Sequence, residues 1–197
     1  MKKLLLIFLT FLSFTTFVGC QKVQNKGTEL IYESLSEKEE HLLNLTENKV
    51  LMYKLNNPPS DKEYEILLTY EVYENDKKVK KETITVIRND SSNEESKNQT
   101  IGINLKSDKI RYILASEGSY RSGSYDIEED LNKYSQSFLV NNVDLTIGTE
   151  ICIFYANLGS SISESIPLRV PIDLNVTNDI LKDYESNILT KLSFNEI

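Results

Sequence analysis

The sequence predicts a mainly β fold, an antiparallel β-sandwich of immunoglobulin-like architecture, with a short N-terminal helix. Apolar and polar side chains alternate over several short segments, turn residues separate those segments, and no helices alternate with them. The likeness is one of architecture, because a chain without tryptophan cannot place one against paired cysteines as a true immunoglobulin domain does.

The clearest strand is expected over residues 63–73, where one face is apolar: Tyr64, Ile66, Leu68, Tyr70 and Val72. A turn at residues 74–77 leads to a second strand over 79–88, which makes this the strongest hairpin signal in the chain. Glutamates of the first strand face lysines of the second, at Lys78, Lys80 and Lys81. Such pairs stabilise a hairpin by roughly 0.2–1 kcal/mol each, so we interpret these charges as structural.

Further strands are expected over residues 100–105, 109–115, 138–147, 150–156 and 165–170. The first two form a second hairpin, and the third carries a bulge at Asn141 and Asn142. Residues 150–156 are the most apolar segment and are predicted to lie at the centre of a sheet. The tail leaves two alternatives open, a helical turn over 179–187 and a closing strand over 188–194.

One helix is expected over residues 31–47. Ser36 followed by Glu39 has the spacing of a capping box, and acidic residues occupy the first turn. An imperfect apolar stripe runs along this segment: Leu35, Leu42, Leu43 and Leu45. Residues 56–61, with two asparagines and two prolines, should end any regular structure there.

The first twenty residues have the order of parts of an export signal. Lys2 and Lys3 precede an uncharged apolar run over residues 4–18, followed by Gly19 and Cys20. The run is shorter than the roughly 20 residues that cross a bilayer. An ordinary secretory signal would have a small residue where Phe17 stands, three positions before Cys20.

Residues 17–20 resemble the lipobox of bacterial lipoproteins, although Phe17 stands where that family usually has leucine. The resemblance implies cleavage between Gly19 and Cys20 and coupling of Cys20 to a diacylglycerol, whose acyl chains, such as palmitate, enter the membrane. It implies a signal peptide at 1–19, a flexible lipidated tether at 20–28 and one domain over 29–197. The expected location is the extracytoplasmic face of the cell membrane, and the Lys-, Asn- and Ile-rich composition favours a Gram-positive cell.

The charge of the chain limits its expected partners. Without residues 1–19 the protein has 20 basic and 30 acidic residues, a net charge of −10. Because phosphate backbones repel so acidic a protein, nucleic acid is not expected as a partner. The lipid anchor is the expected contact with the membrane.

The sequence matches none of the motifs for catalysis, metal binding or cofactor binding that we considered. No nucleotide-binding glycine motif or nucleophile elbow occurs, and the one histidine, His41, cannot build a zinc site. The acidic run that starts at Asp126 resembles a calcium loop, but Leu131 and Ser137 replace the required glycine and glutamate. Cys152 lies in an apolar segment and is expected to be a small buried side chain. No metal and no cofactor is predicted.

Residues 116–125 depart from this structural pattern. They are rich in Tyr, Ser, Gly and Arg, the composition of adaptable recognition loops, which makes Tyr120, Arg121 and Tyr125 the candidate binding residues. A plain exposed hairpin would explain the same composition.

Three functions stay open at this stage. The first is a binding module that captures a protein or peptide ligand, for example an immunity lipoprotein that sequesters a cationic antibacterial peptide. The second is an envelope hydrolase that works with carboxylates, since two acids across a cleft leave no motif. The third is a structural or assembly subunit without a ligand of its own.

Overall fold

The computed structural model describes residues 27–46, 49–89, 99–116, 119–159 and 181–197. The predicted signal peptide, Cys20, most of the tether and the predicted strand over 165–170 lie outside these ranges. Within the described residues, no helix combines the length and the apolar character that crossing a bilayer requires.

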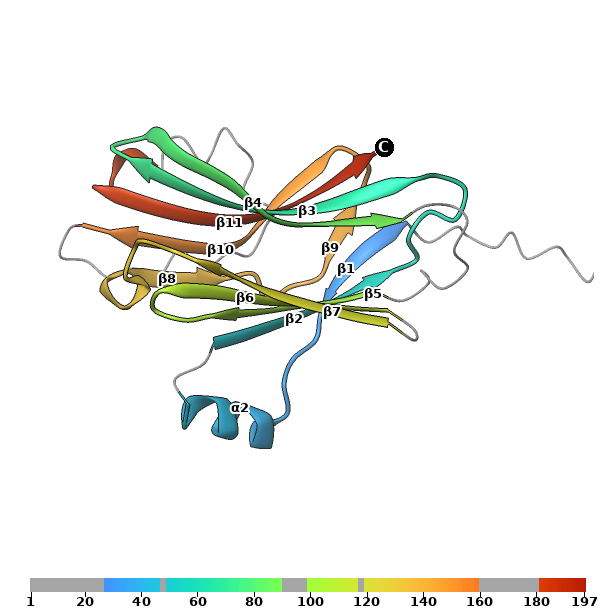
Figure 1. Cartoon of the computed structure of the whole chain (residues 1–197), viewed down its shortest axis with the longest axis horizontal. Coiled ribbons are helices and arrows are strands. Elements are labelled where there is room, and N and C mark those ends of the chain that lie inside the picture. The colour runs from blue at the N-terminus through green and yellow to red at the C-terminus, as the bar shows by residue number, and fades with distance from the viewer. Residues whose placement is uncertain (1–26, 47–48, 90–98, 117–118, 160–180) are drawn as a thin grey trace, which may run out of the picture.

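The described residues form a mainly β fold with two antiparallel sheets (Figure 1). The first sheet has six strands in the spatial order β7 (Ser119–Asp126), β6 (Lys109–Ser116), β5 (Gln99–Leu105), β2 (Lys49–Asn56), β1 (Thr28–Tyr32) and β9 (Val143–Leu145). The second has five, in the order β4 (Lys77–Asn89), β3 (Tyr64–Glu74), β11 (Ser186–Glu196), β10 (Thr149–Leu158) and β8 (Ser135–Phe138). Helix α2 (Glu37–Asn44) and the short 3-10 helix η3 (Leu131–Lys133) lie between strands.

The two sheets share one apolar core. The apolar face predicted for β3 is buried along its whole length, from Tyr64 to Val72. It packs with residues of the first sheet such as Tyr53 and Ile103 in a single cluster. Tyr53 is fully buried, and its hydroxyl donates a hydrogen bond of 2.7 Å to the Leu139 carbonyl. Alternation in the sequence therefore predicted correctly which side chains of β3 enter the core.

The start of the predicted helix is wrong. Helix α2 begins at Glu37, and the capping box of Ser36 and Glu39 is present as predicted. Residues before it form β1, where Leu30 is fully buried opposite Leu55 of β2. The pairing with β2 and the burial of Leu30 stabilise the strand more than an additional, frayed helical turn would stabilise the helix. The local helical pattern is therefore overridden here.

Two of the predicted strands are placed differently in the structure. The expected strand over 138–147 is divided, because β8 belongs to the second sheet and β9 to the first. The chain crosses between the sheets near Asn141 and Asn142, where a bulge was predicted. Strand β10 is indeed very apolar, but β11 occupies the middle of the second sheet. The tail is mainly strand, after a short helical turn at residues 181–182.

Candidate functional site

The predicted recognition segment is the second strand of a hairpin. Strand β7 pairs with β6, with Tyr120 opposite Ala115 and Arg121 opposite Leu114. Because successive side chains of a strand point to opposite faces, Tyr120 lies on one face of the sheet and Arg121 and Tyr125 on the other. The three candidate residues therefore do not converge on one site.

Tyr125 contributes to the packing between the sheets. Its ring centroid lies 5.9 Å from that of Tyr70 on β3, and it packs against the core while half-buried. Burial raises the pKa of Tyr125. Tyr120, in contrast, is 72% exposed, and its hydroxyl lies 3.3 Å from Ser122 Oγ.

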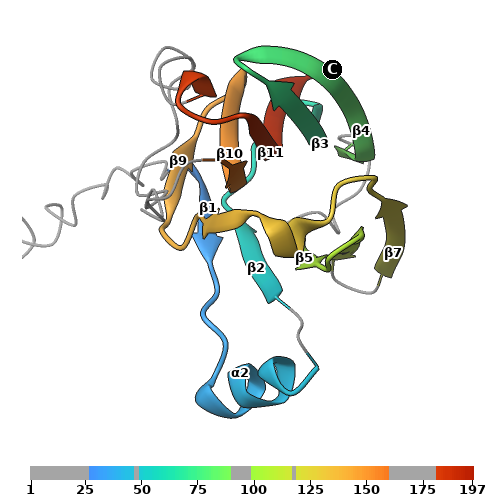
Figure 2. The same cartoon turned by 90° about the vertical axis from the view of Figure 1, so that its left-hand side faces the viewer.

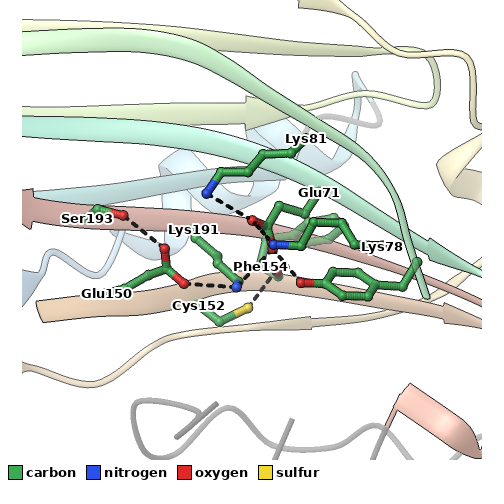
Figure 3. Close-up of polar contacts among 9 residues, drawn as sticks. Glu71, Lys78, Lys81, Glu150, Cys152, Phe154, Lys191 and Ser193 are labelled. Atoms are coloured by element: carbon green, nitrogen blue, oxygen red, sulfur yellow. Dashed lines mark hydrogen bonds and ion pairs between the residues drawn. The ribbon is translucent and has the colours of Figure 1, made fainter. Parts of the chain in front are cut away.

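A cluster of charged side chains lies on the face of the second sheet opposite the one that carries Tyr70 and Val72 (Figure 3). Glu71 is fully buried at its centre. One carboxylate oxygen lies 2.7 Å from Lys78 Nζ and 3.4 Å from Lys81 Nζ. The other lies 2.9 Å from Lys191 Nζ and accepts a hydrogen bond of 2.7 Å from the Tyr73 hydroxyl. Lys78 and Lys81 thus pair with a glutamate of β3, as predicted, whereas Lys80 lies 3.8 Å from Glu128, outside the hairpin.

The same lysine joins this cluster to a second carboxylate. Lys191 Nζ lies 2.9 Å from Glu150 Oε1, and Ser193 Oγ donates a hydrogen bond of 3.2 Å to Glu150 Oε2 (Figure 3). Only 4% of the Lys191 side chain is exposed. The ammonium is therefore held between two carboxylates, which is the arrangement that offsets the desolvation of a buried charge.

The electrostatics of the cluster favour the charged forms of Glu71 and Lys191. Burial by itself would raise the pKa of Glu71, but hydrogen bonds from Lys78, Lys191 and Tyr73 outweigh it and lower the pKa to about 2. Burial by itself would lower the pKa of Lys191, but Glu71 and Glu150 raise it. A general acid needs a raised carboxyl pKa and an amine nucleophile a lowered one. Both shifts run the other way, so the cluster does not favour the hydrolase alternative.

Cys152 lies beside this cluster and is buried as predicted, with 3% of its surface exposed. Its thiol donates a hydrogen bond of 3.0 Å to the Phe154 carbonyl. Burial raises the pKa of the thiol to about 12, although the nearby Lys191 acts in the opposite direction. A reactive thiol needs a lowered pKa and access to solvent, and Cys152 has neither.

Within the described ranges, no group of three or more His, Cys, Asp and Glu side chains is arranged to hold a metal ion. Two of the acidic residues that resemble the start of a calcium loop form ion pairs with lysines instead: Asp126 pairs with Lys109, and Glu128 pairs with Lys80. His41 lies in the last turn of α2 and is exposed.

The exposure of helix α2 could not be predicted from the sequence, although the helix itself was. It projects from the first sheet, to which connecting segments join it on both sides (Figures 1 and 2). None of its residues is buried. Leu42 is 56% exposed and Leu45 is 82% exposed. The sequence placed these leucines in an imperfect apolar stripe, and nothing in the local pattern says whether such a stripe is covered or exposed.

Comparison of the chain with models of protein families, with curated proteins and with solved structures finds no match.

Proposed function

We propose that the mature protein is a lipoprotein, held by Cys20 at the extracytoplasmic face of the membrane of a Gram-positive cell, and that it binds a cationic peptide or protein segment on helix α2. The observation that carries the binding part is the exposure of Leu42 and Leu45 on a helix that buries none of its residues. The anchor rests on the lipobox-like ending of the first twenty residues.

Helix α2 lacks what usually stabilises a helix in a protein. It has eight residues, and an isolated helix of that length is marginal in water. Its capping box satisfies the first amide groups, but its leucines bury little surface. A partner that covers Leu42 and Leu45 would supply the missing apolar contact, as in recognition modes where a helix lays its apolar side against a groove.

The charge of α2 indicates the chemistry of that partner. Its first turn carries Glu37, Glu39 and Glu40, and the mature chain has an excess of acidic residues. Opposite charge around an apolar contact accelerates association and disfavours anionic competitors. The partner is therefore an amphipathic cationic segment, which is also the chemistry expected if the protein sequesters an antibacterial peptide.

The two sheets serve in this proposal as the rigid base that presents α2. Their shared core supports a β-sandwich, and the immunoglobulin-like architecture remains part of the proposal. Strands β1 and β2 pair directly before and after the helix, with Tyr32 opposite Tyr53, so both connecting segments start from the first sheet.

The anchor is tested by membrane fractionation and mass spectrometry of the N-terminal peptide, with the unchanged chain beside Cys20→Ala. We expect a diacylated peptide that starts at Cys20, and loss of both the lipid and the membrane association in the variant. An uncleaved N-terminus, or equal membrane association of the two proteins, would contradict the anchor and leave the binding part standing.

The binding part is tested separately by calorimetric titration of the full chain with a synthetic amphipathic helix of leucine and lysine. The variant replaces Leu42 and Leu45 by serine, and the control is Val140→Ser, an apolar residue that is 52% exposed elsewhere on the surface. We expect the affinity to fall about tenfold or more in the variant, as the loss of two apolar contacts implies, and to stay unchanged in the control. Equal affinity of all three proteins would rule out α2 as the binding site.

A further inference from the structure

Strand β7 forms one edge of the first sheet, and no described strand lies beyond it. It runs along one margin of the molecule (Figure 2). An edge strand exposes a row of backbone donors and acceptors that can pair with another strand, and proteins usually protect such edges. The way in which each edge of this protein is protected therefore shows which edge is available for pairing.

The other three edges carry recognisable protection. Strand β4 carries four lysines within residues 77–81 and two further charged residues, Glu82 and Arg88, and charged side chains, lysine above all, are used to prevent strand pairing. Strands β8 and β9 are only four and three residues long. Strand β7 has eight residues with no lysine and no proline, and its middle consists of Ser122, Gly123 and Ser124. Among the four edges of the described sheets, β7 is the one whose own sequence protects it least.

The hydrogen-bond pattern shows which backbone groups of β7 face outward. Ile127 N donates to Asp108 O at 2.9 Å, so the neighbouring pair of Lys109 and Asp126 is a non-hydrogen-bonded pair of the ladder. The pattern alternates along an antiparallel ladder. The N–H and C=O groups of Tyr120, Ser122, Ser124 and Asp126 therefore point away from β6, toward the free edge.

The sequence of β7 is complementary to itself about Gly123. If two copies pair antiparallel with the two-fold axis at Gly123, Ser122 lies opposite Ser124 of the second copy, and those outward backbone groups meet. Tyr120 lies opposite Asp126, so that a phenol hydroxyl can donate to a carboxylate. Arg121 lies opposite Tyr125 in a non-hydrogen-bonded pair, where side chains approach most closely and a guanidinium can stack on an aromatic ring.

Other two-fold registers lack this complementarity. An axis at Ser122 would place Arg121 opposite Gly123 and Tyr120 opposite Ser124, with no charged or aromatic pair. An axis at Gly123 also brings the least bulky residue to the position where the two chains approach each other. Tyr112 of β6 covers Gly123 on the inner face, since a Cβ added there would lie within 2.3 Å of its hydroxyl.

From these observations we infer that two copies of this chain associate through β7, in antiparallel register about Gly123, and join their first sheets into one continuous sheet. The association is isologous, because the same strand serves both copies. It uses a different surface from α2, which connects β1 and β2, and β6 and β5 separate these two strands from β7 in the first sheet. The association therefore does not depend on the proposed ligand. Two copies held on one membrane would meet at a raised effective concentration.

The register is tested by disulfide trapping with the full chain, purified in detergent with micelles in excess over protein. One preparation carries Ser122→Cys, another Ser124→Cys, and the two are oxidised separately and as a mixture. In the inferred register residues 122 and 124 lie directly opposite, with Cα atoms about 5.5 Å apart, within reach of a disulfide. The two copies of residue 122 are offset by two positions and lie about 8 Å apart, which is beyond it.

We expect a disulfide-linked dimer in the mixture and little or none in either preparation alone. Equal cross-linking of Ser122→Cys alone would overturn the register, and no cross-linking in the mixture would overturn the association. Sedimentation of the unchanged chain gives a second measurement that does not depend on cysteine variants. The dimer fraction should rise with protein concentration and fall in Ser122→Pro, whose lost N–H faces the edge, but not in Ser60→Lys, at an exposed position away from β7. A monomer at every concentration would also refute the inference.

Discussion

The ammonium group of Lys191 lies 2.9 Å from a carboxylate oxygen of Glu71, and both side chains are closed to solvent. Lys191 comes from β11 and Glu71 from β3, so the pair links the C-terminal strand to the strongest hairpin of the chain. A buried pair of this kind adds little over an apolar pair of the same size, but loss of one partner leaves an uncompensated charge.

Replacement of Lys191 by methionine should therefore destabilise the protein strongly. We expect a loss of about 3–5 kcal/mol in the free energy of unfolding, because Glu71 and Glu150 would face each other's charge without the ammonium between them. The measurement is chemical denaturation followed by circular dichroism. The control is Lys81→Met, the same exchange at a side chain that is 51% exposed and lies 3.4 Å from Glu71. A loss in Lys191→Met no larger than in the control would contradict the prediction.

The cluster should also make the stability depend on pH in the acid range. The pKa of Glu71 is lowered to about 2 in the folded protein, and in the unfolded chain it returns to about 4.5. A lowered pKa contributes stability above the unfolded value and loses it as the pH falls. We expect the free energy of unfolding to drop between pH 4.5 and pH 2 by an amount on the order of 3 kcal/mol.

The variant Glu71→Gln isolates this contribution, because glutamine does not titrate. It should be less stable than the unchanged protein at neutral pH, and the two stabilities should converge toward pH 2. Parallel pH profiles of the two proteins would show that Glu71 does not carry the acid sensitivity.

The thiol of Cys152 should be unreactive while the protein is folded. It is buried and its pKa is raised to about 12, so almost no thiolate forms at neutral pH. Titration with an aromatic disulfide reagent should give no reaction at this residue at pH 8 and full reaction in guanidinium chloride. Rapid labelling of the native protein would mean that the strands around β10 open locally.

Removal of the helix cap should affect α2 without affecting the rest of the fold. Ser36 Oγ accepts a hydrogen bond of 3.4 Å from the Glu39 amide, and Ser36→Ala costs such a helix about 1 kcal/mol. Because α2 buries no residue, the melting temperature of the protein should change little. Amide exchange of residues 39–44 should become faster, and binding of a cationic peptide should weaken with it. A clear drop in melting temperature would show that α2 supports the core.

The local features of the chain were predictable because each depends on neighbouring residues alone. Alternation over residues 64–72 identified the buried face of β3, and the spacing of Ser36 and Glu39 identified the helix cap. The isolated Cys152 in an apolar segment was correctly expected to be buried. The candidate residues Tyr120, Arg121 and Tyr125 were close together in sequence, but strand alternation separates them in space.

Features that depend on which segments meet could not be read from the sequence. Glu71 alternates with apolar residues and reads as an exposed charge, yet it is fully buried and pairs with Lys78 and Lys191 from two other strands. Leu42 and Leu45 belong to an imperfect apolar stripe in the sequence, and only the structure shows that both are exposed.

The sequence by itself determined that this protein is mainly β, which face of β3 enters the core, that Ser36 and Glu39 form a helix cap, and that its first twenty residues resemble a lipoprotein signal. The tertiary structure decided that β11 lies at the middle of its sheet, that Glu71 is buried, that the leucines of α2 are exposed and that β7 is an open edge. The physical reason is that side-chain periodicity is a property of one segment, whereas burial and edge exposure are properties of the neighbours that folding brings to it.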